Sequence, residues 1–245
     1  MKAAWRWSSL ALVVLLVFGV VGGVAQIKNP DSYIEAVIGD LETLDPAWHY
    51  DTSSATAIFN IYDTLVFYDG GAIDKFVPVL AESWTVSPDG STYTFKIRKG
   101  VKFHAGGDLT ADDVAYSFQR ALLQDRSGGP IHMVIEPVLD VYSIDELAKK
   151  VGDLQACQKV LEAATVKGDE VTFKLAFPFG PFLQILAGSW MSIIDKEWAI
   201  ARGDWDGKCD NWRKWWDPKA EASKLFDVAN GTGPYKLVKW DKGKE

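Results

Sequence analysis

The sequence predicts a mixed α/β fold of the α+β kind, because hairpins and helices follow one another without a regular alternation of strand and helix. Two segments carry this prediction: a strand–turn–strand pattern over residues 81–98, and a capped, amphipathic helix that begins after residue 110. With 245 residues, 48% of them hydrophobic, the chain can bury a substantial core. Its formal net charge of -7 argues against a nucleic-acid partner.

The first residues have the pattern of a secretory signal peptide. Lys2 and Arg6 precede an apolar run over residues 10–21, and residues 23–25 include the small side chains that a cleavage site requires. We therefore expect a signal peptide over residues 1–25 and an exported mature chain. The alternative is a retained membrane anchor, but the apolar run of about twelve residues is shorter than the roughly 20 that span a bilayer. We expect no stable membrane insertion after cleavage.

The mature chain begins with a predicted strand over residues 33–38, which is rich in strand-forming side chains and stops at a glycine. A turn follows at residues 43–46. Apolar residues then recur every three or four positions, which predicts a helix over residues 51–65 with its N-cap among residues 51–53.

A hairpin is predicted next. Residues 81–86 and 92–98 form its strands, and Ser87-Pro88-Asp89-Gly90 supplies the turn, because proline presets φ and glycine accepts a positive φ. Alternate residues of the second strand are apolar, so one face of the pair should be buried.

Thr110 is a good N-cap for the helix that follows, and Asp112 and Asp113 suit the positive end of its dipole. An apolar stripe along this helix should face the core, and the loop at residues 127–130 ends it. The remaining predicted elements are a short strand at 138–141, a helix over 144–164 weakened by Gly152, a strand at 171–175, a short helix at 182–186, a helix at 195–202 and a last strand at 235–240.

Two cysteines, Cys157 and Cys209, lie in the mature chain. An even number in an exported protein permits a disulfide, which would close a loop of about 53 residues. The alternative is a pair of buried thiols, and spacing alone leaves both open.

Six segments, in order along the chain, carry a family pattern. They run from Leu44 to Pro46, Ile61 to Val66, Val77 to Trp84, Ser87 to Gly90, Tyr93 to Ser117, and Gly231 to Tyr235. Together they resemble the family 5 extracellular solute-binding proteins, the dipeptide, oligopeptide and nickel type. Most of these residues are turns and caps, so the pattern is largely folding information.

The resemblance implies a two-lobed periplasmic-binding-protein fold that closes on a solute. Residues 26–245 would be lobe I, truncated before the second lobe and the C-terminal return, so we expect a fragment or a shortened reading frame. The implied function is the substrate-binding component of an ABC transporter, which captures peptides or similar small solutes. The implied partners are a permease and its ATPase subunits, the implied location is the periplasmic or extracellular face of the cell envelope, and no cofactor is implied.

The loop after the first strand lines the cleft in the family that this chain resembles. It comprises Gly39, Asp40, Leu41, Glu42 and Thr43. Its acids could attract a peptide amino group through charge-assisted hydrogen bonds, although an ordinary solvated turn is the alternative.

Two further loops are implied by the same resemblance. Ser189, Trp190 and Met191 would approach the ligand, with a core tryptophan as the alternative, and Gly128 and Gly129 lie on a loop that could reach the cleft.

Other functions stay open within and outside this fold. Nine tryptophans in the mature chain hint at an oligosaccharide carrier, although core packing also explains them. A nickel-chelate carrier is a further alternative, and an exported hydrolase or a sensory ectodomain would be a different class. The sequence has no Gly-x-Ser-x-Gly, His-Glu-x-x-His or phosphate-loop motif, so we expect no catalysis and no metal site.

Overall fold

The computed structural model describes residues 31–243, so the predicted signal peptide over residues 1–25 lies outside the described residues. Residues 31–37 belong to a separate unit and are exposed without regular secondary structure. The strand predicted over residues 33–38 is therefore wrong. Its side chains favour extended backbone, but a strand also needs a hydrogen-bonded neighbour, and none pairs with it in the described part of the chain.

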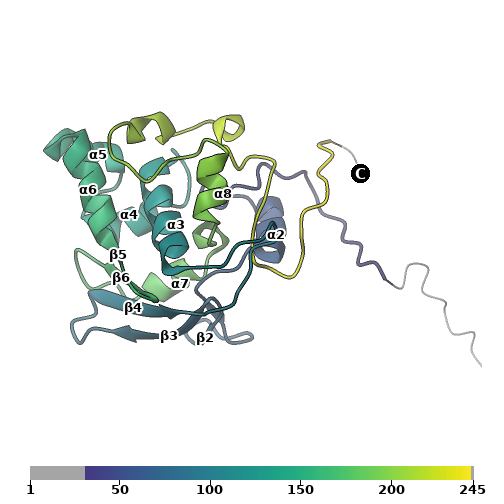
Figure 1. Ribbon diagram of the computed structural model, residues 1–245, viewed down its shortest axis with the longest axis horizontal. Helices are drawn as coiled ribbons and strands as arrows, with labels where there is room; N and C mark the ends of the chain where they lie inside the picture. Colours follow the sequence, from purple (N-terminus) through teal and green to yellow (C-terminus); the bar gives the residue numbers. More distant parts are fainter. Residues whose placement is uncertain (1–30, 244–245) are drawn as a thin grey trace, which may run out of the picture. The chain divides into compact units, whose positions relative to one another are not determined.

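The domain that follows is built on a four-stranded antiparallel sheet. Its order is β3 (Ala81–Val86), β4 (Thr92–Ile97), β6 (Glu170–Lys174) and β5 (Ala164–Lys167). Helices cover one face of this sheet, as Figure 1 shows. Strands β1 (Val66–Tyr68) and β2 (Phe76–Pro78) form a second, two-stranded sheet. The mixed α/β class expected from the sequence is confirmed.

The hairpin formed by β3 and β4 matches its prediction. Gly90 has φ +72°, and its amide donates to the Ser87 carbonyl across 2.8 Å. Tyr93, Phe95 and Ile97 are buried, as the alternation requires.

Helix α3 (Ala111–Gln124) is the central helix on this sheet. Thr110 caps it, and the Asp113 carboxylate accepts the Thr110 amide across 2.8 Å, which completes a capping box. The predicted apolar stripe of this helix is buried, and the Phe118 ring lies 4.5 Å from that of Phe173 on β6. Local capping chemistry and packing therefore specify the same helix.

Residues 138–141 do not form the predicted strand. Val138 and Leu139 are the last residues of α4 (His132–Leu139), in which Val134, Ile135 and Val138 are buried at helical spacing. So short and mostly apolar a segment fits either element, and the longer helical pattern decides here.

The helix predicted over residues 144–164 is divided at Gly152, which has φ +91°. Its parts are α5 (Ile144–Val151) and α6 (Asp153–Ala163), and the chain enters β5 at Ala164. The shorter elements are α2 (Thr52–Ile61), α7 (Phe182–Leu186), α8 (Lys196–Ala201) and the 3-10 turns η1 (Ser189–Met191), η2 (Trp212–Trp215) and η3 (Ala220–Ala222).

The final strand predicted at residues 235–240 is also wrong. The amides of Gly233 and Tyr235 donate to the Ile61 and Asn60 carbonyls at the end of α2, across 2.9 and 3.0 Å. This segment therefore lies against a helix end and not beside a strand, which its strand-like composition could not reveal.

Cys157 in α6 and Cys209, beyond α8, form a disulfide with their Cα atoms 5.6 Å apart.

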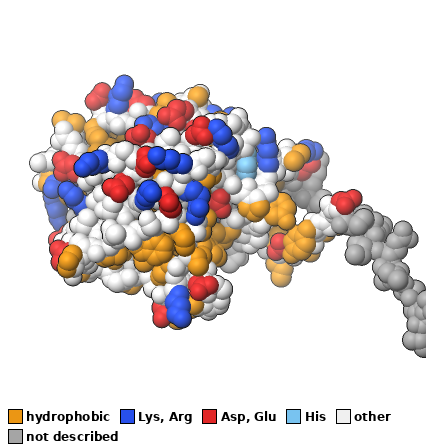
Figure 2. All heavy atoms as spheres, turned by 60° about the horizontal axis from the view of Figure 1, so that its bottom comes forward, with side chains coloured by type: hydrophobic (Ala, Val, Ile, Leu, Met, Phe, Trp, Pro, Cys, Tyr) orange, Lys and Arg blue, Asp and Glu red, His pale blue; other side chains and the backbone are white. Residues whose placement is uncertain are grey.

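Figure 2 shows hydrophobic side chains gathered on the face that carries the sheet. Exposed apolar residues of the strands include Phe67, Val77 and Val86. Among residues 31–243, no helix combines the length and the apolar composition that crossing a membrane requires.

Candidate functional site

The loop at residues 39–43 is attached to the first turn of α2. Asp51 caps this helix by accepting the Ser54 amide across 2.7 Å. The buried Ser54 hydroxyl accepts the amides of Glu42 and Thr43, across 2.9 and 3.3 Å. Gly39 has φ +99°, a backbone conformation that favours glycine, so the loop can turn toward the helix.

The residues of this loop are not equally available to a ligand. Thr43 is buried, and its hydroxyl donates to the Phe226 carbonyl across 3.2 Å. The exposed Asp40 carboxylate accepts the amide of Gly243 at 2.6 Å and the indole N–H of Trp240 at 3.0 Å. These bonds lower the pKa of Asp40. Glu42 is exposed, so it is the acid of this loop that can most readily meet a ligand.

The loop that carries Gly128 and Gly129, here called the glycine loop, lies beside the segment before α2. Gly128 has φ +71°, and a side chain on Gly129 would lie 2.9 Å from the Arg126 carbonyl. The Arg126 guanidinium lies 4.1 Å above the Trp48 ring, and its Nε donates to the Trp48 carbonyl across 2.9 Å. The positive φ of Gly128 and the close contact at Gly129 both favour glycine, and the Arg126 contacts hold this loop beside Trp48.

The third predicted segment forms η1, which contacts α2. Ser189 and Met191 are buried, whereas Trp190 is half-buried and meets Tyr50 edge to face with 6.1 Å between ring centroids. A side chain at Gly188 would lie 2.4 Å from the Trp190 indole, so glycine lets that ring fold back. Of the three residues, Trp190 alone is accessible enough to contact a ligand directly.

The structure thus brings the three predicted loops together around residues 45–51. Trp48, Tyr50 and Trp190 present aromatic surface there, Arg126 supplies a positive charge, and Glu42 supplies a negative one. Rings beside charges of both signs can pack against apolar side chains and hydrogen-bond to polar ends of a small solute. Sequence reasoning missed Trp48, Tyr50 and Arg126, although all three flank predicted elements.

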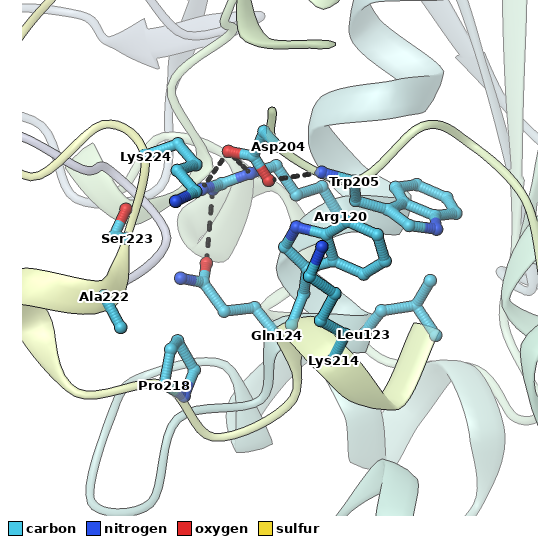
Figure 3. Close-up of a pocket in the computed structure, with 11 residues that line it drawn as sticks. Arg120, Leu123, Gln124, Asp204, Trp205, Lys214, Pro218, Ala222, Ser223 and Lys224 are labelled. Atoms are coloured by element: carbon cyan, nitrogen blue, oxygen red, sulfur yellow. Dashed lines mark hydrogen bonds and ion pairs between the residues drawn. The ribbon is translucent and has the colours of Figure 1, made fainter. Parts of the chain in front are cut away.

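A buried ion cluster is centred on Arg120, which Figure 3 shows with Gln124 and Asp204. Arg120 on α3 donates to both oxygens of Asp45 across 2.9 and 2.7 Å, and its Nε donates to Asp204 across 2.9 Å. Asp45 also accepts hydrogen bonds from Gln124 and Ser223. Burial would raise the pKa of Asp45, but the Arg120 guanidinium outweighs burial and holds that pKa below its usual value.

The ion cluster borders a small cavity of about 50 Å³, whose lining includes Lys214, Trp215 and Lys224. Every N–H group of Arg120 already has a carboxylate or amide partner. We therefore assign the cluster to holding the Leu44–Pro46 turn, α3 and the segment after α8 together. The spacing of Tyr116, Arg120 and Gln124 along one face of α3 is the signal that could have found it.

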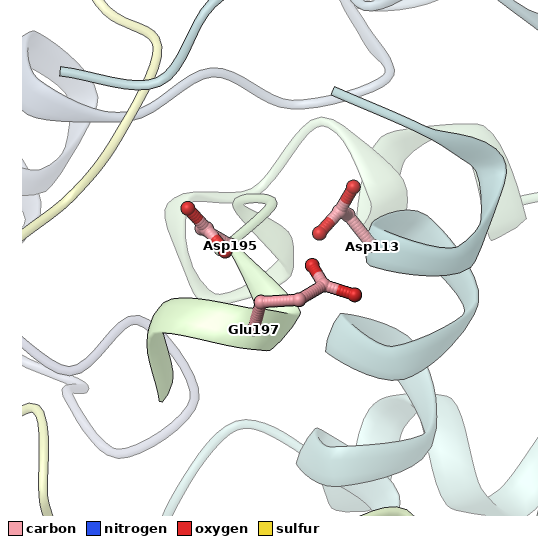
Figure 4. A group of neighbouring side chains, drawn as sticks. All are labelled: Asp113, Asp195 and Glu197. Carbon is pink, nitrogen blue, oxygen red and sulfur yellow. The ribbon is translucent and has the colours of Figure 1, made fainter. Parts of the chain in front are cut away.

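A second acidic group, Asp113, Asp195 and Glu197, has carboxylate oxygens within 4.8 Å of one another (Figure 4). Asp113 accepts the amides of Thr110 and Lys196, and Asp195 accepts the Trp198 amide. Burial raises the pKa of both aspartates. Because their oxygens cap the starts of α3 and α8, we interpret these acids as helix caps and assign no metal to them.

The model of the bacterial extracellular solute-binding proteins, family 5 Middle, matches residues 75–245. The dipeptide-binding protein of Escherichia coli K12 is 32% identical over 200 residues, which cover 79% of this chain and 31% of that protein. Di/tripeptide-binding protein 2 of Pseudomonas aeruginosa is 34% identical over 212 residues, covering 82% and 34%.

Solved structures of peptide-binding proteins are also similar to this chain. The periplasmic binding protein DppA of Helicobacter pylori, in complex with the peptide STSA, superimposes with a TM-score of 0.56 and 28% identity. The match covers 83% of this chain and 36% of that one. The chain therefore spans about a third of the length of the relatives that it matches.

Proposed function

The chain belongs to the family 5 bacterial extracellular solute-binding proteins, and from this premise we propose that it helps to capture small peptides outside the cytoplasm for delivery to an ABC transporter. The family resemblance predicted from the sequence is confirmed. Residues 26–245 would form lobe I of the binding protein, preceded by a signal peptide over residues 1–25. A permease and its ATPases would accept the peptide.

This proposal rests on one observation: the relatives are peptide-binding proteins, and the candidate site has the chemistry that a peptide needs. Relatives named as dipeptide- and di/tripeptide-binding proteins match most of this chain. The three predicted loops meet around residues 45–51, where aromatic rings and charges of both signs suit a peptide. We infer that Glu42, Trp190 and the glycine loop contact the peptide, and that Thr43, Ser189 and Met191 support them from the core.

The proposed activity is binding without catalysis. Three of the buried acids have structural roles: Asp45 pairs with Arg120, and Asp113 and Asp195 cap helices. The named relatives are binding proteins. This supports a carrier over the hydrolase alternative.

Calorimetry with the purified protein tests the proposal. The panel comprises dipeptides and tripeptides, the same peptides with acetylated amino ends, an oligosaccharide and a nickel chelate. We expect heat from the peptides with free amino ends alone. Glu42→Gln should weaken their binding by about tenfold or more, because a hydrogen bond between charged groups is worth about 1.5–3 kcal/mol.

The matched control is Glu82→Gln, which removes an exposed carboxylate on β3 that pairs with Lys96 at 2.9 Å. This variant should bind peptides like the parent protein. Binding of the sugar or the chelate, with no heat from any peptide, would replace the peptide proposal by one of the other cargo classes.

A further inference from the structure

We propose that the segment at residues 204–226, here called the strap, positions two of the candidate ligand loops, and that Asp217 is its positioning residue for the glycine loop. The inference rests on the proposed function, because it concerns the same site. The strap follows α8 and includes η2 and η3 but no strand. Its position is therefore set by side-chain contacts and a few isolated backbone hydrogen bonds, and not by the regular hydrogen bonds of a sheet.

The start of the strap is fixed on α3. The Asp204 carboxylate pairs with Arg120 across 2.8 Å. Trp205, only 1% exposed, stacks on Tyr116 with ring centroids 5.5 Å apart and an angle of 11° between the planes. The Tyr116 hydroxyl donates to the Trp205 carbonyl across 2.7 Å. These contacts bury the first two strap residues in the core.

The next part of the strap is fixed on α6. Cys209 is bonded to Cys157 of α6. The buried Trp212 donates its indole N–H to the carbonyl of Asp153 at the start of α6, across 2.9 Å. Arg213 pairs with the Asp153 carboxylate at 2.8 Å. One covalent bond and two polar contacts therefore hold the strap before it reaches the site.

Beyond this anchor, the strap bonds to the segment that carries the glycine loop. The Asp217 carboxylate accepts the Ser127 amide across 2.7 Å and the Ser127 hydroxyl across 3.0 Å. The Asp217 amide donates to the Gln124 carbonyl, and the indole of Trp48 donates to the Pro218 carbonyl, both across 2.8 Å. Ser127 directly precedes the two glycines, so Asp217 sets where their loop begins.

The end of the strap bonds to the candidate loop at residues 39–43 and to the turn that follows it. The Phe226 carbonyl accepts the Leu44 amide across 2.8 Å and the Thr43 hydroxyl across 3.2 Å. The Ser223 hydroxyl donates to the Asp45 carboxylate. A single irregular segment thus connects the disulfide with two of the three candidate loops, which lie more than 80 residues apart in sequence.

Asp217 is suited to test this role because it is exposed and has φ +46°. That left-handed backbone tolerates glycine and asparagine, so the side chain can be changed without a new backbone strain. Asp217→Gly removes both bonds to Ser127, whereas Asp217→Asn retains an amide oxygen that can accept the Ser127 amide. Asp140→Gly is the matched control, since Asp140 is also an exposed aspartate with positive φ, at the end of α4.

Amide hydrogen exchange and peptide binding are measured in parallel on the whole protein, with a dipeptide that has a free amino end. In Asp217→Gly, exchange of the Ser127 amide should accelerate by about tenfold or more, and dipeptide affinity should fall by roughly three- to tenfold, because the loop then samples other positions. Amides of β4 and β6 should keep their protection. In Asp217→Asn, Ser127 exchange and dipeptide affinity should both stay close to those of the parent protein. Asp140→Gly should change neither quantity.

Unchanged exchange at Ser127 in Asp217→Gly, or equal loss of protection across the sheet, would overturn the positioning role. If the parent protein binds no dipeptide but the Ser127 amide responds as expected, the positioning stands and the peptide function fails. In the double variant Cys157→Ser and Cys209→Ser, strap amides should lose protection before those of β4 and β6. Uniform loss would show that the strap is not a separate unit.

Discussion

Replacing Arg120 by methionine should be among the most damaging single changes in this domain. Arg120 is shared by Asp45 and Asp204, whose side chains are 0% and 2% exposed. Removing one partner of a buried ion pair costs about 3–5 kcal/mol, because the remaining charge stays buried and uncompensated. One cation here serves two acids, so we expect a loss of about 4–5 kcal/mol in the free energy of unfolding. For a domain of this size, that lowers the melting temperature by about 8–20 °C.

Urea unfolding followed by tryptophan fluorescence and circular dichroism measures this loss. The midpoint should fall, and the slope against urea should stay constant if the folded state is otherwise unchanged. Lys99→Met is the control, since it breaks an exposed pair with Asp169 at 2.6 Å. An exposed pair of this kind contributes about 0–1 kcal/mol.

The dependence on pH provides a second check of the same reasoning. In the parent protein the pKa of Asp45 is held below its usual value, so its stabilising effect is present above that usual value and is lost as pH falls through the lower, folded-state pKa. Without Arg120, burial should instead raise the pKa of Asp45, and acidification from pH 7 to pH 5 should partly relieve the variant. A loss below about 1 kcal/mol that does not change with pH would refute the argument.

Three further predictions concern the fold. Gly231→Ala should cost more than about 3 kcal/mol, measured by thermal unfolding, because a Cβ there would lie 2.0 Å from the Ile61 carbonyl oxygen, whereas Gly71→Ala meets nothing within 4 Å and should change little. Phe173→Ala should cost about 3–5 kcal/mol in urea unfolding, since the ring packs against those of Phe95 and Phe118. Burial raises the pKa of Asp125 to about 6, so the parent protein should lose stability as pH rises through 6. Asp125→Asn should abolish that loss and gain about 1–3 kcal/mol at pH 7, and equal melting curves against pH for both proteins would contradict this.

The parts of the fold that could be predicted from the sequence are those specified by neighbouring residues. The turn at Ser87 to Gly90 and the Thr110 cap need only a few adjacent side chains, so the hairpin and α3 follow from them. The strands predicted at residues 33–38 and 235–240 have a suitable composition, but pairing depends on distant partners. Composition near a chain segment cannot say whether a strand, a helix end or solvent lies beside it.

The candidate loops could be named only through the family resemblance, and the contacts that position them were beyond prediction. The bond from Thr43 to Phe226 spans 183 residues, and that from Ser127 to Asp217 spans 90. None of these side chains has a periodic pattern or a recognisable spacing. A serine and an aspartate in two loops look like ordinary solvated residues until the chain folds.

The tryptophan-rich tract at residues 203–217 shows why irregular sequence can still determine the site. Trp205 and Trp212 are each 1% exposed, and they fix the strap to α3 and α6. Trp215 and Trp216 are half-buried beneath Lys214 and Arg213. These rings therefore explain the aromatic enrichment by packing, which weakens the hint of a sugar cargo. Because the same tract leads directly to Asp217, its large buried rings set the position of a loop that no local pattern could place.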